Sequence, residues 1–370
     1  MRRLLSEIFA AEADFEVAVA RDGAEALAKA AEFHPDVITL DVHMPGMDGL
    51  ACLDRIMVER PCPVVMVSSL TEEGAEETLD AIALGAVDFF PKPRGAVSIA
   101  IEAVAPDLVA IVRAAAGARI SRATRLTERV RMRGALLESR ARTRAGLARP
   151  RPRSTPVALS DALPGAVQGL AAASGEGLPA TRLVLVGTST GGPPALDALL
   201  GSLPADFGPA LVVAQHMPAT FTGPLARRLD RLCALPVAEV TAATPIQGGH
   251  VYIGRGDADL LISRRGGTLI ALPAPMSGEH HWHPSVERLV ESAMLQVPAY
   301  NLIGVLMTGM GNDGAAAMTA LHAAGGETIA EAEESAVVWG MPGALVAAGG
   351  AAQVVPLERI AGVLTALVRR

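Results

Sequence analysis

LVLVGTSTGG, from Leu183 to Gly192, joins four consecutive aliphatic residues to a glycine-rich turn. Four aliphatic residues in a row predict a strand that is buried on both faces. The turn predicts a sharp entry into a helix, from Pro194 to Leu200. Gly-x-Ser-x-Gly is the nucleophile-elbow signature, which would hold Ser189 at the end of the sheet, within reach of a substrate. The same residues also fit a serine that caps the next helix. Other segments of the chain are therefore needed to distinguish a nucleophile from a helix cap.

Two apolar strands further along end in residues that would complete a serine nucleophile. A predicted strand at 209–214 is followed by His216, and another at 301–307 is followed by Asp313. Carboxyl ends of parallel strands share one edge of a sheet, so we expect Ser189, His216 and Asp313 to lie together there. His216 would take the serine proton, and Asp313 would hold the imidazole in the required tautomer. The chain order Ser, His, Asp is not that of the α/β-hydrolases.

Two shorter features complete the C-terminal half. Segments 249–254 and 260–263 flank a turn around Gly256, which predicts an antiparallel hairpin. His280, His281 and His283 cluster in a polar loop without a common metal-ligand spacing. We expect these histidines to line the substrate entrance.

The first 116 residues alternate strands with helices, which predicts another doubly wound parallel sheet. Asp41, Ser68 and Lys92 each follow a predicted strand, at the edge where ligands bind in such sheets. A carboxylate can accept a phosphoryl group, and a lysine and a hydroxyl can stabilise its oxygens. The predicted strands are 16–20, 36–40, 63–67 and 86–90, and the predicted helices are 22–33 and 98–116.

The segment DVHMPGMDG (Asp41–Gly49), with Ser68-Ser69 and Lys92-Pro93, resembles the receiver domain of bacterial response regulators. The resemblance implies a flavodoxin-type fold. It also implies that Asp41 is the phosphoacceptor, Ser68 the switch hydroxyl and Lys92 the phosphate partner.

The resemblance lacks the beginning of a receiver. Receivers start with a buried strand that ends in two acids that hold Mg²⁺, whereas residues 1–5 match the middle of the family's first helix. Mg²⁺ needs oxygen ligands, and only Asp41 and a backbone carbonyl near His43 would remain, so no metal site is intact. We expect the true start to lie upstream; the alternative is a crippled receiver. Translation of the upstream reading frame would decide between them.

Composition sets the class of protein. The 370 residues predict two domains, and 50% hydrophobic residues with 3% aromatic residues predict aliphatic cores. Three scattered cysteines, Cys52, Cys62 and Cys233, indicate reduced thiols in the cytoplasm. No apolar run fits a signal peptide or a membrane span. We therefore expect a cytoplasmic protein without membrane insertion.

Positive charge is concentrated in one stretch in the middle of the chain. Between Val112 and Ser154 there are thirteen Arg and two Glu, a local charge of +11 that leaves −18 for the rest of a chain of net charge −7. The run has no interleaved aromatic residues, so we interpret it as a solvated tether and not as a nucleic-acid site. The predicted organisation is a receiver at 1–116, an Arg-rich linker at 117–180 and a catalytic domain at 181–370.

Several segments of the catalytic domain, behind a leading receiver, resemble the chemotaxis protein-glutamate methylesterase (CheB) family. Two positions depart from the family: Gly343 stands where Arg is usual, and Ala332 lies in a segment that is usually more polar. The segments that carry the resemblance are Gly187–Gly192, Gln215–Met217, His283–Glu287, Thr308–Gly314 and Val338–Pro342.

The resemblance implies a Rossmann-like esterase domain in which Ser189 attacks the methyl ester of a receptor glutamate. Backbone N–H groups of Thr190 and Met310 would hold the oxyanion, and His216 would protonate methanol and then activate water. A receptor glutamine would be deamidated by the same route. The implied partners are methyl-accepting chemotaxis receptors and a chemotaxis histidine kinase. The unphosphorylated receiver would cover the site, and phosphorylation of Asp41 would uncover it. The esterase would need no cofactor; Mg²⁺ would serve only the receiver.

Two other classes remain open. Gly187-x-Ser189-x-x-Gly192 after a strand is compatible with a dinucleotide-binding oxidoreductase, although Ser189 replaces the glycine that lets a pyrophosphate approach. The Arg-rich run is compatible with a DNA-binding response regulator, although no helix-turn-helix segment follows. A catalytically dead adaptor is a third possibility, against which the intact Ser189, His216 and Asp313 argue.

Overall fold

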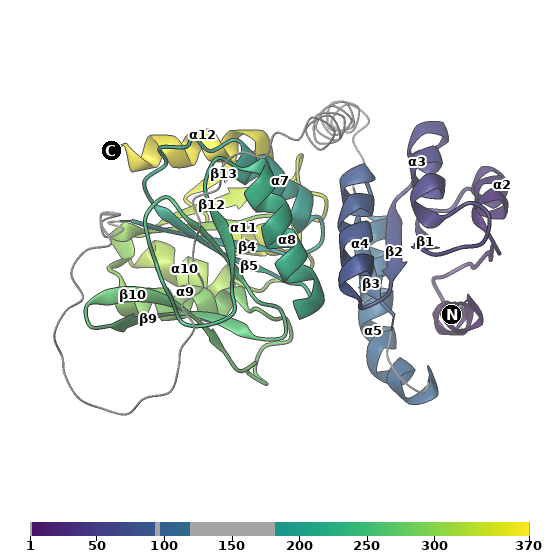
Figure 1. Ribbon diagram of the computed structural model, residues 1–370, viewed down its shortest axis with the longest axis horizontal. Coiled ribbons are helices and arrows are strands. Elements are labelled where there is room, and N and C mark those ends of the chain that lie inside the picture. Colours follow the sequence, from purple (N-terminus) through teal and green to yellow (C-terminus); the bar gives the residue numbers. More distant parts are fainter. Residues whose placement is uncertain (1, 93–96, 119–181, 370) are drawn as a thin grey trace, which may run out of the picture. The chain divides into compact units, whose positions relative to one another are not determined.

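The computed structural model describes residues 2–92, 97–118 and 182–369. The predicted linker at 117–180 lies almost wholly outside the described residues, so the domain boundaries stay a prediction. No helix among the described residues is long and apolar enough to cross a membrane. Figure 1 shows the receiver-like part in purple and blue and the second part in teal to yellow.

Residues 2–118 form a three-stranded parallel sheet with helices. The strand order is β1-β2-β3, and β2 is buried along its whole length between its two neighbours. Asp22, predicted as the first helical residue, is instead the N-cap of its helix and accepts a hydrogen bond from the Glu25 N–H. The elements are α1 (Arg2–Ala10), α2 (Gly23–Phe33), β1 (Ile38–Asp41), α3 (Gly49–Glu59), β2 (Val64–Ser68), α4 (Glu72–Leu84), β3 (Asp88–Pro91) and α5 (Val97–Ala116).

The predicted strand at 16–20 is wrong. Residues 15–20 form no strand, and Val19 is exposed. An extended segment becomes a strand only when a neighbour bonds its N–H and C=O groups. Among the described residues β1 is an edge strand whose only sheet partner is β2. Residues 15–20 do not pair with the open edge of β1, so the predicted segment forms no ladder.

Residues 182–369 are built on a seven-stranded sheet in which every paired neighbour is parallel, as the apolar runs predicted. The order is β13-β12-β11-β4-β5-β8-β6, so the strand that precedes Ser189 lies in the middle. The sheet strands are β4 (Leu183–Thr188), β5 (Ala210–Gln215), β6 (Val237–Val240), β8 (Val251–Gly254), β11 (Leu302–Leu306), β12 (Glu327–Glu331) and β13 (Gln353–Val355).

Alternate residues of β4 face two separate hydrophobic layers. Val184 and Val186 pack with α7, α8 and α12, whereas Leu183 and Leu185 pack with α9, α10 and α11. Figure 1 shows α7 and α8 on the side of the sheet opposite to α9 and α10. The helices are α7 (Gly192–Gly201), α8 (Ala219–Leu232), α9 (Val286–Gln296), η1 (Ala299–Asn301), α10 (Ala315–Ala323), α11 (Met341–Ala347) and α12 (Leu357–Val368).

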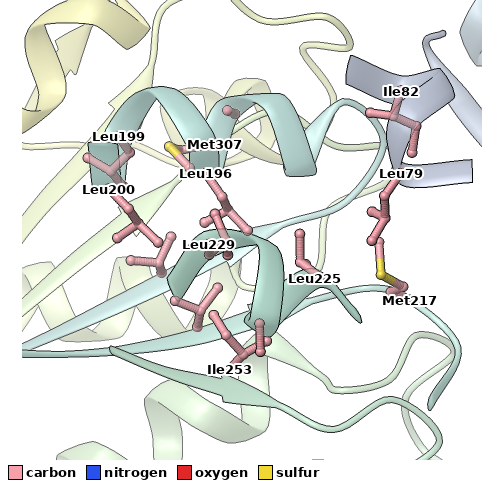
Figure 2. Packing of buried hydrophobic residues seen from close by; sticks show 14 of the residues in the cluster. Leu79, Ile82, Leu196, Leu199, Leu200, Met217, Leu225, Leu229, Ile253 and Met307 are labelled. Carbon is pink, nitrogen blue, oxygen red and sulfur yellow. The ribbon is translucent and has the colours of Figure 1, made fainter. Parts of the chain in front are cut away.

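The first of these layers is aliphatic, as the composition predicted. Figure 2 shows Leu196 and Leu200 of α7 close to Leu229 of α8 and Ile253 of β8, and all four side chains are fully buried. Burial of a leucine or isoleucine side chain stabilises the fold by about 1.5–3 kcal/mol. This layer therefore holds α7, which begins directly after the Ser189 turn, firmly on the sheet.

The predicted hairpin at 249–263 is wrong in its partner. β8 joins the parallel sheet between β5 and β6, and β9 (Asp259–Arg265) instead pairs antiparallel with β10 (Thr268–Ala274). β7 (Thr244–Pro245) adds to β10 to complete a small antiparallel sheet. The reason is that residues 251–254 are buried on both faces, which suits a central parallel strand and not one arm of a surface hairpin.

Candidate active site

Ser189 and His216 leave the sheet side by side because β4 and β5 are paired to their last residues. Thr188 faces Gln215 in the parallel register. The His216 N–H donates to the Thr188 carbonyl oxygen at 3.0 Å. The buried Gln215 side chain donates through Nε2 to the carbonyl oxygens of both Ser189 and His216, each at 3.0 Å. One amide group thus braces the two strand exits against each other.

The Ser189 turn is also tied to the loop that follows β11. The Ser189 N–H donates to the Thr308 carbonyl oxygen at 3.0 Å, and the Thr308 hydroxyl donates to the Thr190 carbonyl oxygen at 2.8 Å. The two segments approach so closely that a Cβ atom at Gly309 would lie 2.8 Å from the Ser189 Cβ. Gly191, at φ +76°, supplies the left-handed residue with which the turn enters α7.

Asp313 lies at the N-terminal end of α9. Its Oδ2 accepts hydrogen bonds from the Val286 N–H at 2.7 Å and from His216 Nε2 at 2.8 Å. Its Oδ1 accepts from the Glu287 N–H and the Ser285 hydroxyl, each at 3.1 Å. Burial alone would raise the pKa of Asp313, but the hydrogen bond and charge of His216 and the helix N–H groups bring it below its usual value. Asp313 is therefore held as a carboxylate.

The imidazole of His216 is oriented by that carboxylate. Its side chain is 4% exposed, and Trp282 stacks on it with ring centroids 5.9 Å apart. Since Nε2 is bonded to Asp313, the neutral ring carries its lone pair on Nδ1. Nδ1 is buried and has no hydrogen-bond partner among the residues that the structure describes. The structure thus brings His216 and Asp313 into contact and leaves the Ser189–His216 hydrogen bond unformed.

The two predicted oxyanion donors, the backbone N–H groups of Thr190 and Met310, lie on the two loops that meet at Thr308. Neither N–H donates a hydrogen bond to any described part of the chain.

A second buried carboxylate, Asp259, holds the loop before α9. It accepts hydrogen bonds from His283 Nδ1 and the Ser285 N–H, both at 2.8 Å, and from the Arg288 guanidinium. Burial would raise the pKa of Asp259, but these three donors bring it below its usual value. The network fixes the start of α9, whose Val286 and Glu287 N–H groups bind the Asp313 carboxylate. The three histidines of this loop do not converge, since His281 contacts Asp107 at 3.2 Å.

Sequence reasoning did not single out Gln215, Asp259 or Trp282. A polar residue at the last position of an otherwise aliphatic strand marks Gln215 as a residue with a task at the sheet edge. Asp259 begins a strand and is fully buried, which an isolated aspartate in sequence does not reveal. Trp282, one of two tryptophans in the chain, stands between two of the loop histidines.

The receiver part brings together two of its three predicted residues. Lys92 Nζ lies 2.7 Å from Asp41 Oδ1, which also accepts the His43 N–H at 3.0 Å. The Ser68 hydroxyl is buried and bonds instead to Thr78 at 2.6 Å and to a carbonyl oxygen of α4. Ser68 therefore points to α4 and not to Asp41.

Asp41 is the predicted carboxylate ligand of Mg²⁺ in the receiver part, and its Oδ1 lies against Lys92 Nζ. A hard divalent cation takes oxygen ligands, usually with more than one carboxylate. Asp41 Oδ1 is already bonded to Lys92, and no group of three or more His, Cys, Asp or Glu side chains within the described ranges could hold a metal.

Strand β3 of the receiver part contacts the Ser189 turn. The Thr190 hydroxyl donates to Asp88 Oδ2 at 2.5 Å. Next to this contact in β3, the ring centroid of Phe89 lies 4.2 Å from that of Phe221 on α8. Burial raises the pKa of Asp88 to about 6, against the hydrogen bonds from Thr190 and the Phe89 N–H. One of the two predicted oxyanion residues is thus held by the receiver part.

Comparisons with known proteins cover the whole chain. A family model described as CheB methylesterase matches residues 184–364, and one described as response regulator receiver domain matches residues 1–102. The chain is 52% identical over 98% of its length to protein-glutamate methylesterase/protein-glutamine glutaminase 2 of Rhodopseudomonas palustris, of which 93% is covered. It is 49% identical over its full length to the enzyme numbered 3 of Rhodospirillum rubrum, of which 94% is covered.

A solved structure, the CheB methylesterase catalytic domain of Thermotoga maritima, is 35% identical, with a TM-score of 0.49, and the match covers 50% of this chain and 98% of that one. The two full-length relatives match the receiver part and the catalytic part in the same order. The chain therefore belongs to the CheB family of protein-glutamate methylesterases/protein-glutamine glutaminases, which carry a response-regulator receiver domain.

Proposed function

We propose that this chain hydrolyses glutamate methyl esters, and deamidates specific glutamines, on methyl-accepting chemotaxis receptors in the cytoplasm, with Ser189, His216 and Asp313 as its catalytic residues. The observation that carries the proposal is the His216–Asp313 pair: the remaining ring nitrogen of His216 has no hydrogen-bond partner within the described residues, and His216 leaves β5 next to the exit of β4 that carries Ser189. Such an arrangement supplies a general base next to a hydroxyl.

The first half of the reaction forms an ester between enzyme and substrate. Ser189 Oγ attacks the carbonyl carbon of the methyl ester while its proton passes to His216 Nδ1. The carbonyl π electrons move onto oxygen, where the N–H groups of Thr190 and Met310 bind the oxyanion. Each such donor contributes about 3–4 kcal/mol to transition-state stabilisation. When the tetrahedral species collapses, the C–O bond to methanol breaks and His216 returns the proton to the departing oxygen.

The second half releases the glutamate. A water molecule gives its proton to His216 Nδ1 and attacks the acyl carbon, and the Ser189 oxygen leaves with that proton. Asp313 stays ionised throughout and stabilises the imidazolium, as its lowered pKa requires. A glutamine follows the same steps with ammonia in place of methanol. The chemistry needs no cofactor.

A methanol-release assay tests this function directly. Receptor-containing membranes are methylated with a labelled methyl donor, and the intact chain is added. We expect volatile labelled methanol to appear in proportion to enzyme concentration, and mass spectrometry to show glutamate at the formerly methylated positions. A chain that releases no methanol in either phosphorylation state would exclude the proposed function.

We propose further that Asp41 is the phosphoacceptor of the receiver part, with a chemotaxis histidine kinase as its donor. A carboxylate oxygen of Asp41 would attack the phosphorus while the donor's leaving group departs, and Lys92 Nζ, at 2.7 Å, would neutralise the new phosphate oxygens. With a small phosphodonor, with and without added MgCl₂, we expect the mass of one phosphoryl group on the Asp41 peptide. Asp41→Asn should lose it and the exposed control Asp36→Asn should keep it. Labelling of Asp41→Asn would contradict the assignment.

The contact between β3 and the Ser189 turn supports a receiver that restrains the catalytic site before phosphorylation. Asp88→Ala removes the acceptor of the Thr190 hydroxyl. We expect methanol release by the unphosphorylated chain to rise by about three- to tenfold, which corresponds to about one net hydrogen bond. Release after phosphorylation should stay at the wild-type level, and Asp206→Ala, at an exposed carboxylate, should change neither rate.

The same contact predicts a pH dependence. The pKa of Asp88 is raised to about 6, because burial against the catalytic part disfavours the carboxylate by more than the hydrogen bonds from Thr190 and the Phe89 N–H favour it. The stabilisation of the interface by the protonated Asp88 carboxyl is therefore fully present below the pKa of an exposed aspartate. It is lost as the pH rises through about 6. The ratio of Asp88→Ala to wild-type basal activity should shrink as the pH rises from about 5 to about 7. A constant ratio would contradict this role of Asp88.

A further inference from the structure

A fully buried carboxylate, Glu331, lies beneath the catalytic loop and has no part in the triad. It is the last residue of β12, directly beside the exit of β11. Its Oε2 accepts the Thr308 N–H at 2.8 Å, and its Oε1 accepts the Ser335 hydroxyl at 2.9 Å. Its backbone carbonyl accepts the Trp339 indole N–H at 2.9 Å. Glu331 thus holds both Thr308, at the start of the loop that carries Met310, and the segment from Ser335 to Trp339.

Thr308 transmits this anchoring to the reacting groups. Its carbonyl oxygen holds the Ser189 N–H, and its hydroxyl holds the Thr190 carbonyl and accepts the Val338 N–H at 3.0 Å. Met310, the second oxyanion donor, follows two residues later. Every hydrogen-bonding group of Thr308 is therefore engaged, and Glu331 is the partner of its N–H.

Both protonation states of Glu331 are satisfied by the same partners. As a carboxylate, it accepts from Ser335 and from Thr308. As a carboxylic acid, Oε1 can donate to the Ser335 hydroxyl, whose own proton then goes to the Ala332 carbonyl at 3.2 Å. The Thr308 hydrogen bond persists in both states, but only the carboxylate places a negative charge beneath the oxyanion loop. Glutamine reproduces the neutral state with the same donor and acceptor positions.

Glu331 changes its protonation state near neutral pH. Burial raises its pKa to about 7, against the hydrogen bonds from Thr308 and Ser335, and the charge of Glu358 adds to the rise. The strands β11 and β13 and the helix α11 packed on β12 carry no titratable side chain. The titratable side chains on the other packed elements and in the adjoining loop are His322 on α10, Glu358 and Arg359 on α12, and Glu333 and Glu334.

We propose that Glu331 is a positioning residue of the esterase, which fixes the oxyanion loop through the Thr308 N–H and slows catalysis when it ionises. The inference rests on the proposed function. A buried negative charge beneath the loop opposes the negative charge that develops on the substrate oxygen, so the neutral form is the faster one. The acceptor at Oε2 is needed in both forms, because without it the buried Thr308 N–H has no partner.

The test compares the full-length wild type with Glu331→Gln and Glu331→Ala in methanol release between about pH 5.5 and about pH 9. We expect Glu331→Gln to match the wild type within about twofold at the acid end and to exceed it by about three- to tenfold above pH 7.5. Glu331→Ala should lose about tenfold or more in kcat at every pH, because the oxyanion loop is misplaced. KM should change little, because the variant leaves receptor binding unaffected.

The outcomes separate cleanly. Superimposable pH profiles for the wild type and Glu331→Gln, or a Glu331→Ala variant with wild-type kcat, would overturn the inference. If Glu331→Ala does not fold, the Glu331→Gln profile alone decides. Ser189→Ala is run in parallel: its full activity would remove the proposed function itself, whereas its inactivity together with unchanged Glu331 profiles would remove only the role of Glu331.

Discussion

Replacement of Ser189 by alanine is expected to lower methanol release from methylated receptors by about 10⁴-fold or more. The variant keeps the hydrogen bonds of the Ser189 N–H and carbonyl, since both belong to the backbone. It loses the oxygen that forms the acyl-enzyme, and neither His216 nor the N–H groups of Thr190 and Met310 can replace a covalent nucleophile. Receptor binding, measured by sedimentation with membranes, should be unchanged.

The matched control is Ser202→Ala. Ser202 is exposed and follows α7 at its C-terminal end, so it shares the helix of the nucleophile turn without touching the site. It should keep wild-type activity and stability. More than about one per cent of wild-type release by Ser189→Ala would show that the ester is not cleaved through a covalent serine intermediate.

Ser189 and His216 could be placed at the sheet edge from sequence because each directly follows a strand whose core is an aliphatic run. Parallel strands put their carboxyl ends at one edge, and the register of β4 with β5 makes the two residues neighbours. Asp313 was harder to place, since it lies seven residues beyond the end of β11. Its position depends on the N-terminal end of α9, whose N–H groups hold its carboxylate. No local pattern encodes that contact.

The errors share a physical cause. The segment at 16–20 has the composition of a strand, but a strand exists only when a neighbour is present to pair with it. The sequence predicts a local hairpin for 249–254, although the uninterrupted burial of residues 251–254 suits the parallel sheet that they join. The Asp88–Thr190 hydrogen bond joins residues 102 positions apart. Such pairings depend on tertiary packing, which local sequence periodicity does not predict. The alternatives of a dinucleotide-binding oxidoreductase and a DNA-binding regulator are excluded by the family to which the chain belongs.

Replacement of Asp313 by asparagine is expected to lower kcat by about 10⁴-fold while the fold is kept. With its oxygen at the Oδ1 position, asparagine still accepts the Glu287 N–H and the Ser285 hydroxyl, but it loses the hydrogen bond from the Val286 N–H, which Oδ2 shares with His216 Nε2. Its NH₂ group, however, would donate to His216 Nε2 and so move the ring proton to Nδ1. A protonated Nδ1 cannot accept the Ser189 proton, so the nucleophile is not activated even though every heavy atom stays in place.

Two measurements check this reasoning together with methanol release. The ¹⁵N chemical shifts of His216 should show the proton on Nε2 in the wild type and on Nδ1 in the variant. The low pKa of Asp313 stabilises the fold above the pKa of an unfolded aspartate, and this stabilisation is lost as the pH falls through the lower folded value. Asp313→Asn should therefore be less stable than the wild type near neutral pH, with a difference that vanishes in acid. Asp257→Asn, at an exposed left-handed residue where asparagine is equally suited, is the control. Wild-type kcat in Asp313→Asn, or an unchanged tautomer, would show that Asp313 does not set the state of His216.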